Sequence, residues 1–220
     1  MRIVVLGGGC FGVFHVARLV QARSEGRVAF DELVVVDRNE FPRCRRELGE
    51  HAAVRYERSD WQAFLAAWIP SAAAGDKLVP TPFAPHVAFE WVRGSIPGAA
   101  WEPLDPPRGS GLPFERIGRT GTLCLSHADW VCPVDCSEPS TCPAISAPRT
   151  WEMRETVQRL GATDIIVSRH AVDGVAWIDV ADLLALRTRL ASLREPTRVA
   201  LATVSSCHGA MTCGTWRPGK

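Results

Sequence analysis

Three glycines near the amino terminus have the spacing of a phosphate-binding turn. Gly7, Gly9 and Gly12 follow a short apolar run, and the residues after Gly12 have a helical pattern of apolar side chains. In such a turn the first glycine permits a tight bend, and the second lets the backbone approach a pyrophosphate. The third allows the helix to pack closely on the strand, and the helix amino terminus faces the negative charge. The pattern predicts a dinucleotide-binding site.

Asp37, at the end of the next apolar run, is the expected ribose-binding residue. It lies somewhat farther from Gly12 than is usual, which a loop over residues 24–31 explains. A carboxylate accepts hydrogen bonds from ribose hydroxyls and repels a 2′-phosphate, so the sequence predicts NAD over NADP, with the neighbouring Arg38 acting against this preference. Cys10 and Phe11 complete the expected cofactor-binding set. A glycine turn without a nucleotide is the alternative.

The second candidate site consists of cysteines. Cys132, Cys136 and Cys142 share one proline-rich loop, and Cys207 directly follows the expected last strand, so that four thiolates are available. Four thiolates suit an iron–sulfur cluster or tetrahedral zinc. Prolines directly after Cys132 and Cys142 favour a [4Fe–4S] cluster, and the absence of paired C-x-x-C motifs disfavours zinc, which stays the alternative.

Several alternatives stay open at this cysteine site. Cys213, Cys124 or His208 could replace Cys207 as the fourth ligand. Dithiol redox chemistry and simple reduced thiols are also compatible with the spacing, since clustered cysteines in a reducing compartment seldom form disulfides. Trp130 and Trp151 flank the loop and could shield a metal from water.

Alternating apolar runs and amphipathic segments predict the architecture. We expect strands at 2–6, 33–37, 53–56, 77–79, 120–126, 164–168 and 198–205, and helices at 11–22, 61–68, 87–92, 151–160 and 180–193. Asp60 and Thr150 are the expected caps of two of these helices. This alternation predicts an α/β fold with a Rossmann-like, doubly wound, mostly parallel sheet and a proline- and cysteine-rich insertion. Cys44, within the arginine-rich stretch 43–46, is expected to be exposed and without function.

The chain is expected to form a single domain over residues 1–220. It would comprise a dinucleotide-binding half (1–94), the insertion (95–150) and a closing α/β half (151–220). The insertion contains too little periodic apolar sequence to fold alone, so we expect it against the carboxyl-end face of the sheet. Gly7, the cysteine loop and Cys207 would then lie along one edge, if their strands are parallel neighbours.

The first part of the chain resembles a known family. The runs Ile3–Gly12 and Val34–Asp37 are similar to the NAD-binding domains of the TrkA-N type, which occur in potassium-uptake regulators. The resemblance covers about residues 1–94 and implies pyrophosphate contacts from Gly7, Gly9 and Gly12 and a ribose contact from Asp37. The cysteine-rich insertion departs from those regulators. The whole chain is also similar to bacterial proteins that share only this domain, which implies no activity.

Composition narrows the choice of partners. The formal net charge of +1 offers no electrostatic attraction to nucleic acid. No apolar stretch approaches the roughly 18–20 residues of a membrane span, and the amino terminus lacks an export signal, so we expect a cytoplasmic protein. Self-association into a homodimer through the apolar helix at 87–92 is expected by analogy with other Rossmann modules.

Two functional hypotheses follow. In the first, the chain is a redox protein in which NAD and a cysteine-bound metal centre serve an oxidoreductase or an electron-transfer subunit with a redox partner protein. In the second, the chain is a non-enzymatic sensor or complex subunit that binds the dinucleotide for regulation and uses zinc only to fold the insertion. A redox-active metal favours the first hypothesis, and redox-silent zinc favours the second.

Overall fold

The computed structural model describes residues 1–80, 86–118, 120–172 and 174–219. The chain divides into two units, the first made of Met1–Trp91 and Arg169–Leu184 and the second of Val92–Ser168 and Ala185–Lys220. Three elements run from one unit into the other: α4 (Val87–Gly94), β10 (Asp164–Val172) and α6 (Val180–Ser192). That all 220 residues fold as one cooperative domain stays a prediction.

The first unit is built on four parallel strands in the order β3-β2-β1-β4. β11 pairs with β4 in the antiparallel direction. The elements of this unit are β1 (Arg2–Leu6), α1 (Cys10–Ser24), β2 (Glu32–Asp37), α2 (Arg43–Leu48), β3 (Val54–Arg58), α3 (Trp61–Trp68), the 3-10 helix η1 (Ile69–Ser71), β4 (Lys77–Val79) and β11 (Val175–Asp179).

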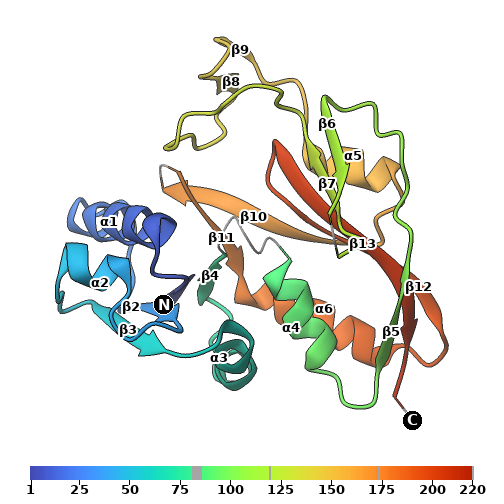
Figure 1. Cartoon of the computed structure of the whole chain (residues 1–220), viewed down its shortest axis with the longest axis horizontal. Helices are drawn as coiled ribbons and strands as arrows, with labels where there is room; N and C mark the ends of the chain where they lie inside the picture. Colours follow the sequence, from blue (N-terminus) through green and yellow to red (C-terminus); the bar gives the residue numbers. More distant parts are fainter. Residues whose placement is uncertain (81–85, 119, 173, 220) are drawn as a thin grey trace. The chain divides into compact units, whose positions relative to one another are not determined.

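Successive side chains of the parallel strands point to opposite faces of the sheet, and this alternation determines how the helices pack on them. Ile3 and Val5 of β1 are buried in one cluster with Val16 and Leu19 of α1 and with Cys44 of α2. Helices α1 and α2 lie on one face of these strands, and α3 lies on the other (Figure 1). Every residue from Ile3 to Leu6 is buried, because β1 is covered on both faces. The turn after β1 is thereby held on a rigid element.

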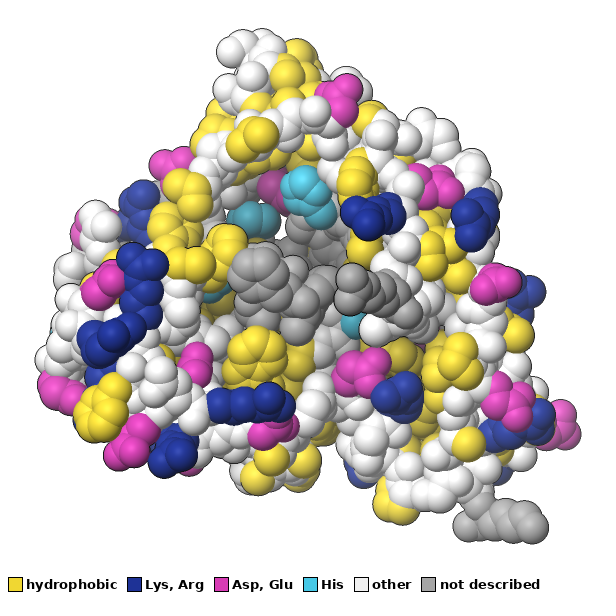
Figure 2. Space-filling model, in the orientation of Figure 1, with side chains coloured by type: hydrophobic (Ala, Val, Ile, Leu, Met, Phe, Trp, Pro, Cys, Tyr) yellow, Lys and Arg dark blue, Asp and Glu magenta, His cyan; other side chains and the backbone are white. Residues whose placement is uncertain are grey.

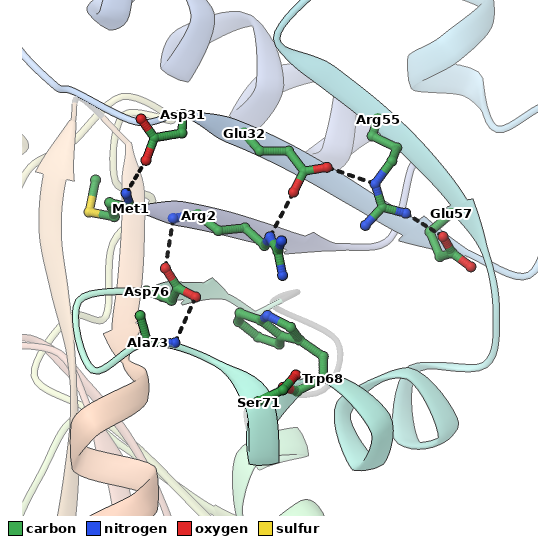
Figure 3. Close-up of polar contacts among 10 residues, drawn as sticks. All are labelled: Met1, Arg2, Asp31, Glu32, Arg55, Glu57, Trp68, Ser71, Ala73 and Asp76. Atoms are coloured by element: carbon green, nitrogen blue, oxygen red, sulfur yellow. Dashed lines mark hydrogen bonds and ion pairs between the residues drawn. The ribbon is translucent and has the colours of Figure 1, made fainter.

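The amino end of β1 is fixed by a buried carboxylate (Figure 3). Asp76 accepts hydrogen bonds from the backbone N–H groups of Arg2, at 2.7 Å, and Ala73, at 3.1 Å. Beside it, Glu32 binds Arg2 and Arg55, and Arg55 also pairs with Glu57, which makes a charged ladder across β1, β2 and β3. The glycine turn lies at the other end of β1.

The second unit is mainly antiparallel. The long strand β13 pairs with β12, β7 and β5, and β7 pairs with β6, all antiparallel, while β10 runs parallel to β12. Helix α5 covers this sheet through Met153 and Val157, which are buried with residues of β7, β12 and β13. The elements of this unit are β5 (Ala100–Leu104), β6 (Phe114–Ile117), β7 (Leu123–Ser126), β8 (Thr141–Cys142), β9 (Ala147–Pro148), α5 (Met153–Arg159), β12 (Thr197–Val204) and β13 (His208–Arg217).

The predicted doubly wound, mostly parallel sheet is wrong for the chain as a whole. The strands form an 11-stranded mixed sheet with the path β3-β2-β1-β4-β11-β10-β12-β13-β7-β6, and β5 pairs with β13. Beyond β4 most neighbouring strands pair in the antiparallel direction, including β4–β11, β12–β13, β13–β7 and β7–β6, whereas a doubly wound fold requires parallel strands joined by helical crossovers. The prediction failed because β5, β6, β11 and β13 carry no parallel-strand signature in the sequence.

Other expectations for single elements also need correction. α2 was not expected, and its Cys44 is buried, not exposed. α5 begins later than predicted, because its N-cap is Glu152 and not Thr150. Asp60 does cap α3, since its carboxylate accepts from the N–H groups of Gln62 and Ala63.

Two features of the surface bear on the expected homodimer contact and on the charge offered to other partners. The apolar side chains of α4, Val87, Phe89, Trp91 and Val92, are all buried, so this helix does not present the apolar dimer contact that we expected. On the face shown in Figure 2, basic and acidic side chains are interspersed. This interspersed charge gives no single-sign surface for nucleic acid on that face.

Candidate functional site

The turn between β1 and α1 requires glycine at two positions. Gly7 has φ +90°, and its N–H donates to the carbonyl of Val36 at 2.8 Å. A Cβ at Gly12 would overlap the carbonyl oxygen of Gly7 and would lie 3.1 Å from its carbonyl carbon. Gly12 therefore lets the first turn of α1 pack directly on the end of β1, as expected from the sequence.

Gly9 has a different environment. Apart from its chain neighbours, no heavy atom of the described residues lies within 4 Å of the place where its Cβ would be, and the residue is exposed. It is the N-cap of α1 and offers no side-chain acceptor to the first turn of the helix. Cys10, the first residue of α1, is also exposed, and Phe11 is half-buried. The backbone here is open to a ligand, at a helix end that attracts negative charge.

Asp37 lies directly beside this turn. Its Oδ2 accepts from the N–H of Gly8 at 2.7 Å, and its Oδ1 accepts from the N–H of Asn39 at 2.8 Å. A carboxylate has about four lone-pair sites, so further acceptor capacity is left on both oxygens. Arg38 donates its Nε–H to Asp60 at 3.0 Å. The structure thus brings together the predicted acidic residue and the glycine turn.

Two contacts to the turn were missed by sequence reasoning. The N–H of Cys44 donates to the carbonyl of Gly8 at 2.8 Å, and a Cβ at Gly8 would overlap Pro42. On the other side, the indole of Trp61 donates to the carbonyl of Val36 at 3.1 Å and lies against Gly7. Cys44 is buried in the apolar cluster of the first unit, and this burial raises the pKa of its thiol. Both contacts are long-range, and no local pattern marks them.

The cysteine loop follows β7, and its three thiols have different settings. Cys132 and Cys136 are half-buried, whereas Cys142 is buried in β8, where it pairs with Ala147 of β9. Cys207 lies in the turn between β12 and β13 and is also buried. β12 is not the last strand, and β13 separates it from β7, so the expected parallel neighbours are wrong. The carbonyl of Cys207 nevertheless accepts from the N–H of His127 at 3.0 Å, directly after β7.

Glu138 connects the cysteine loop to the turn that contains Cys207. Its carboxylate accepts from Ser205 Oγ and Ser206 N–H, each at 2.6 Å, and from Cys207 N–H at 3.2 Å. Its backbone has φ +53°, an uncommon conformation for a residue other than glycine. Glu138 could not be identified from the sequence, because all three donors to its carboxylate lie far along the chain.

Two of the cysteine sulfurs accept hydrogen bonds from nitrogen. The N–H of Glu138 donates to Cys136 Sγ at 3.4 Å, and Trp151 Nε1–H donates to Cys207 Sγ at 3.3 Å. The Trp151 ring is stacked on His127 at a centroid distance of 5.8 Å and meets the edge of Trp130 at 6.0 Å. The two tryptophans that flank the loop in sequence therefore come together next to Cys207.

The thiols influence one another electrostatically. Burial raises the pKa of Cys132, and negative charge on Cys136 or Cys142 would raise it further. Burial raises the pKa of Cys207 to about 11, and negative charge on Cys132 also raises it. The hydrogen bond from Trp151 lowers the pKa of Cys207 but does not offset burial. Within the ranges that the structure describes, no group of three or more His, Cys, Asp or Glu residues is already arranged to hold a metal ion.

The alternative fourth ligands lie elsewhere. Cys213 is buried in β13 within the apolar core of the second unit, opposite Ala200 of β12. Cys124 lies in the middle of β7, opposite Ala210. His208 is exposed at the start of β13. Among these candidates only Cys207 has the direct link to the cysteine loop that Glu138 makes.

Comparison with known proteins identifies the family. Residues 88–217 match the family AF_1314_C, described as "Uncharacterized protein, C-terminal domain". The match covers more than half of the chain, which therefore belongs to this family. No curated protein and no solved structure matches the chain. The matched residues include the cysteine loop and Cys207, whereas the glycine turn precedes them. Among the described residues, no helix has the length and apolarity to cross a membrane.

Proposed function

We propose that the chain binds NAD(H) at the turn between β1 and α1. The observation that supports this best is the hydrogen bond between Asp37 and the N–H of Gly8, because it holds a carboxylate beside an open helix amino terminus. The pyrophosphate would lie over Gly9 and the first turn of α1, since a Cβ at Gly9 would meet no heavy atom of the described residues within 4 Å beyond its chain neighbours. The ribose hydroxyls would donate to the remaining lone pairs of Asp37.

NAD is proposed over NADP on electrostatic grounds. A 2′-phosphate would bring two like charges together at Asp37, which is unfavourable at such short range. Arg38 could offset this repulsion, but its guanidinium is paired with Asp60. Asp60 also caps α3, so its position is fixed by the helix. The proposed preference for NAD is thus supported by Asp37 and by the partner of Arg38.

Calorimetric titration of the whole protein with NAD⁺ and NADP⁺ tests the proposal. We expect NAD⁺ to bind more tightly, and Asp37→Asn to weaken it by about tenfold to a hundredfold, the value of a charged hydrogen bond. Gly9→Ala should weaken the binding of NAD⁺ by at least about tenfold, because the added methyl group would enter the space of the pyrophosphate.

A matched glycine is the control for this experiment. Gly75 also has open space around its Cβ, but it precedes Asp76 at the amino end of β4, away from the turn. Gly75→Ala should bind NAD⁺ like the wild type. Absence of NAD⁺ binding, tighter NADP⁺ binding, or equal effects of Gly9→Ala and Gly75→Ala would each refute the proposal.

The function served by the dinucleotide is proposed to be redox chemistry. NAD(H) itself supplies the hydride transfer, and the protein has to orient it and provide an electron partner. The thiols around Cys207 favour this class over a sensor or complex subunit, because they offer a place for a second redox group. Oxidation of NADH with an artificial electron acceptor, measured anaerobically, separates the two: the redox proposal expects turnover, and a sensor would bind NADH without consuming it.

A further inference from the structure

We propose that Cys132, Cys136, Cys142 and Cys207 bind one metal centre through four thiolates, with Glu138 as the residue that positions the loop. The metal centre would be a [4Fe–4S] cluster or zinc, which share this ligand chemistry. The proposal concerns the second unit alone and does not depend on dinucleotide binding. Since the thiols are not already arranged as a metal site, it includes a movement of the loop thiols toward Cys207.

The first argument is the link made by Glu138. Three hydrogen bonds from residues 205–207 end on its carboxylate, so a loop residue between Cys136 and Cys142 is held against the turn of Cys207. The residue adopts φ +53° in this position, a conformation that is unfavourable for a residue other than glycine.

The second argument is the direction of the hydrogen bonds to sulfur. Glu138 N–H and Trp151 Nε1–H both donate, which leaves Cys136 Sγ and Cys207 Sγ as acceptors. Sulfur accepts such a bond both as a thiol and as a metal-bound thiolate, and the bond is stronger to the thiolate. N–H groups directed at ligand sulfurs also tune metal–thiolate centres and orient their ligands.

The third argument is the shield on one side of Cys207. Trp151 covers its sulfur and is itself flanked by His127 and Trp130. These rings keep water from that side of the site, which favours the bonds between metal and thiolate.

The structure also selects Cys207 over Cys213 as the fourth ligand. Cys213 lies inside the apolar core formed by β7, β12, β13 and α5, where a metal ligand would have to leave its strand. Cys207 lies in a turn that Glu138 already connects to the loop. Because both residues are buried cysteines of the same unit, Cys213→Ser is a matched control for Cys207→Ser.

The test is anaerobic purification of the full chain, followed by iron, sulfide and zinc analysis and a visible spectrum. Iron with labile sulfide and a brown colour, or stoichiometric zinc, supports the site and identifies its metal. We expect Cys207→Ser to lose most of the metal and Cys213→Ser to retain it, with circular dichroism reporting whether each variant is folded. A folded protein that holds no metal and takes up neither zinc nor a reconstituted cluster would overturn the proposal. So would equal metal loss in the two variants.

Glu138→Gln tests the positioning role. Gln keeps one acceptor oxygen but loses the charge that three donors share, so we expect metal release to a chelator to accelerate by about tenfold to a hundredfold. Glu138→Ala should release faster still, so that the conservative variant rescues part of the effect. Unchanged release in a folded Glu138→Ala variant would refute this role, since a merely structural residue would alter the melting temperature without altering the metal.

Discussion

Gly12→Ala is expected to destabilise the first unit whether or not a dinucleotide binds. The added methyl group would overlap the carbonyl oxygen of Gly7, and both sides of this contact are backbone, which side-chain rotation cannot relieve. Overpacking of this kind costs about 1–3 kcal/mol, and the upper part of that range applies because α1 must shift on β1. Alanine returns about 1 kcal/mol through its higher helix propensity. The expected net loss is about 2 kcal/mol.

The assay is thermal unfolding of the wild type and of two alanine variants in the absence of nucleotide. A loss of about 2 kcal/mol corresponds to a melting temperature about 4–8 °C lower for a chain of this size. Gly9→Ala should change the unfolding free energy by only about 0.5 kcal/mol, because no atom lies near its Cβ. The two neighbouring glycines are thereby separated into one that the fold requires and one that the ligand requires.

Two results would refute this reasoning, each at a different glycine. If Gly12→Ala melts at the wild-type temperature, the close approach of α1 to the end of β1 does not exist, and the turn cannot present its N–H groups as described. If Gly9→Ala destabilises the protein as strongly as Gly12→Ala, the open space at Gly9 is wrong instead. The two outcomes are distinct, so a failure identifies which part of the geometry is at fault.

Two further predictions follow from single side chains of the first unit. Burial lowers the pKa of His15 from 6.5 to about 4. Between these two pH values the unfolded chain binds more protons than the folded one, so the free energy of unfolding should fall by up to about 3 kcal/mol as the pH drops from neutral toward 4. His15→Leu should reduce this pH dependence, measured by urea unfolding at several pH values. An unchanged slope would contradict the assignment to His15. Cys10 is exposed in the proposed site, so saturating NAD⁺ should slow the alkylation of its thiol, measured by mass spectrometry. Gly9→Ala should abolish this protection. Alkylation of Cys10 at the same rate with and without NAD⁺ would contradict the proposed position of the pyrophosphate.

Local signals were sufficient for most of the first unit. The apolar run at β1, the glycine turn and the uninterrupted β2 are determined by neighbours in sequence, and the observed strands and α1 follow them. Asp60 capped α3 as expected, because an N-cap depends only on the next few residues. The adjacency of Asp37 and the glycine turn was also predictable, since it follows from parallel pairing of consecutive strands.

The second unit could not be predicted in the same way. β13 contains Gly209 and Gly214, which weaken any strand signal. The structure explains Gly214, because a Cβ there would overlap the indole of Trp101 on β5. That reason lies more than a hundred residues away in the chain, and no window of sequence contains it. β5 and β6 also lack a clear strand pattern in the sequence. β5 is mostly exposed, β6 is half-exposed, and both lie in a proline-rich region.

The choice between a redox protein and a sensor depends on whether the two proposed sites act together. They lie in different units, so Gly9→Ala should remove dinucleotide binding and leave the metal in place, and Cys207→Ser should do the reverse. A redox protein needs both groups for one activity, and either variant would then abolish electron transfer from NADH. Zinc has no accessible second oxidation state, so a zinc-loaded protein that binds NADH without consuming it favours the sensor class. Zinc can also polarise a substrate as a Lewis acid while NADH supplies the hydride, so turnover of NADH by a zinc-loaded protein would keep the redox class. Metal analysis and NADH turnover together therefore distinguish the two functions.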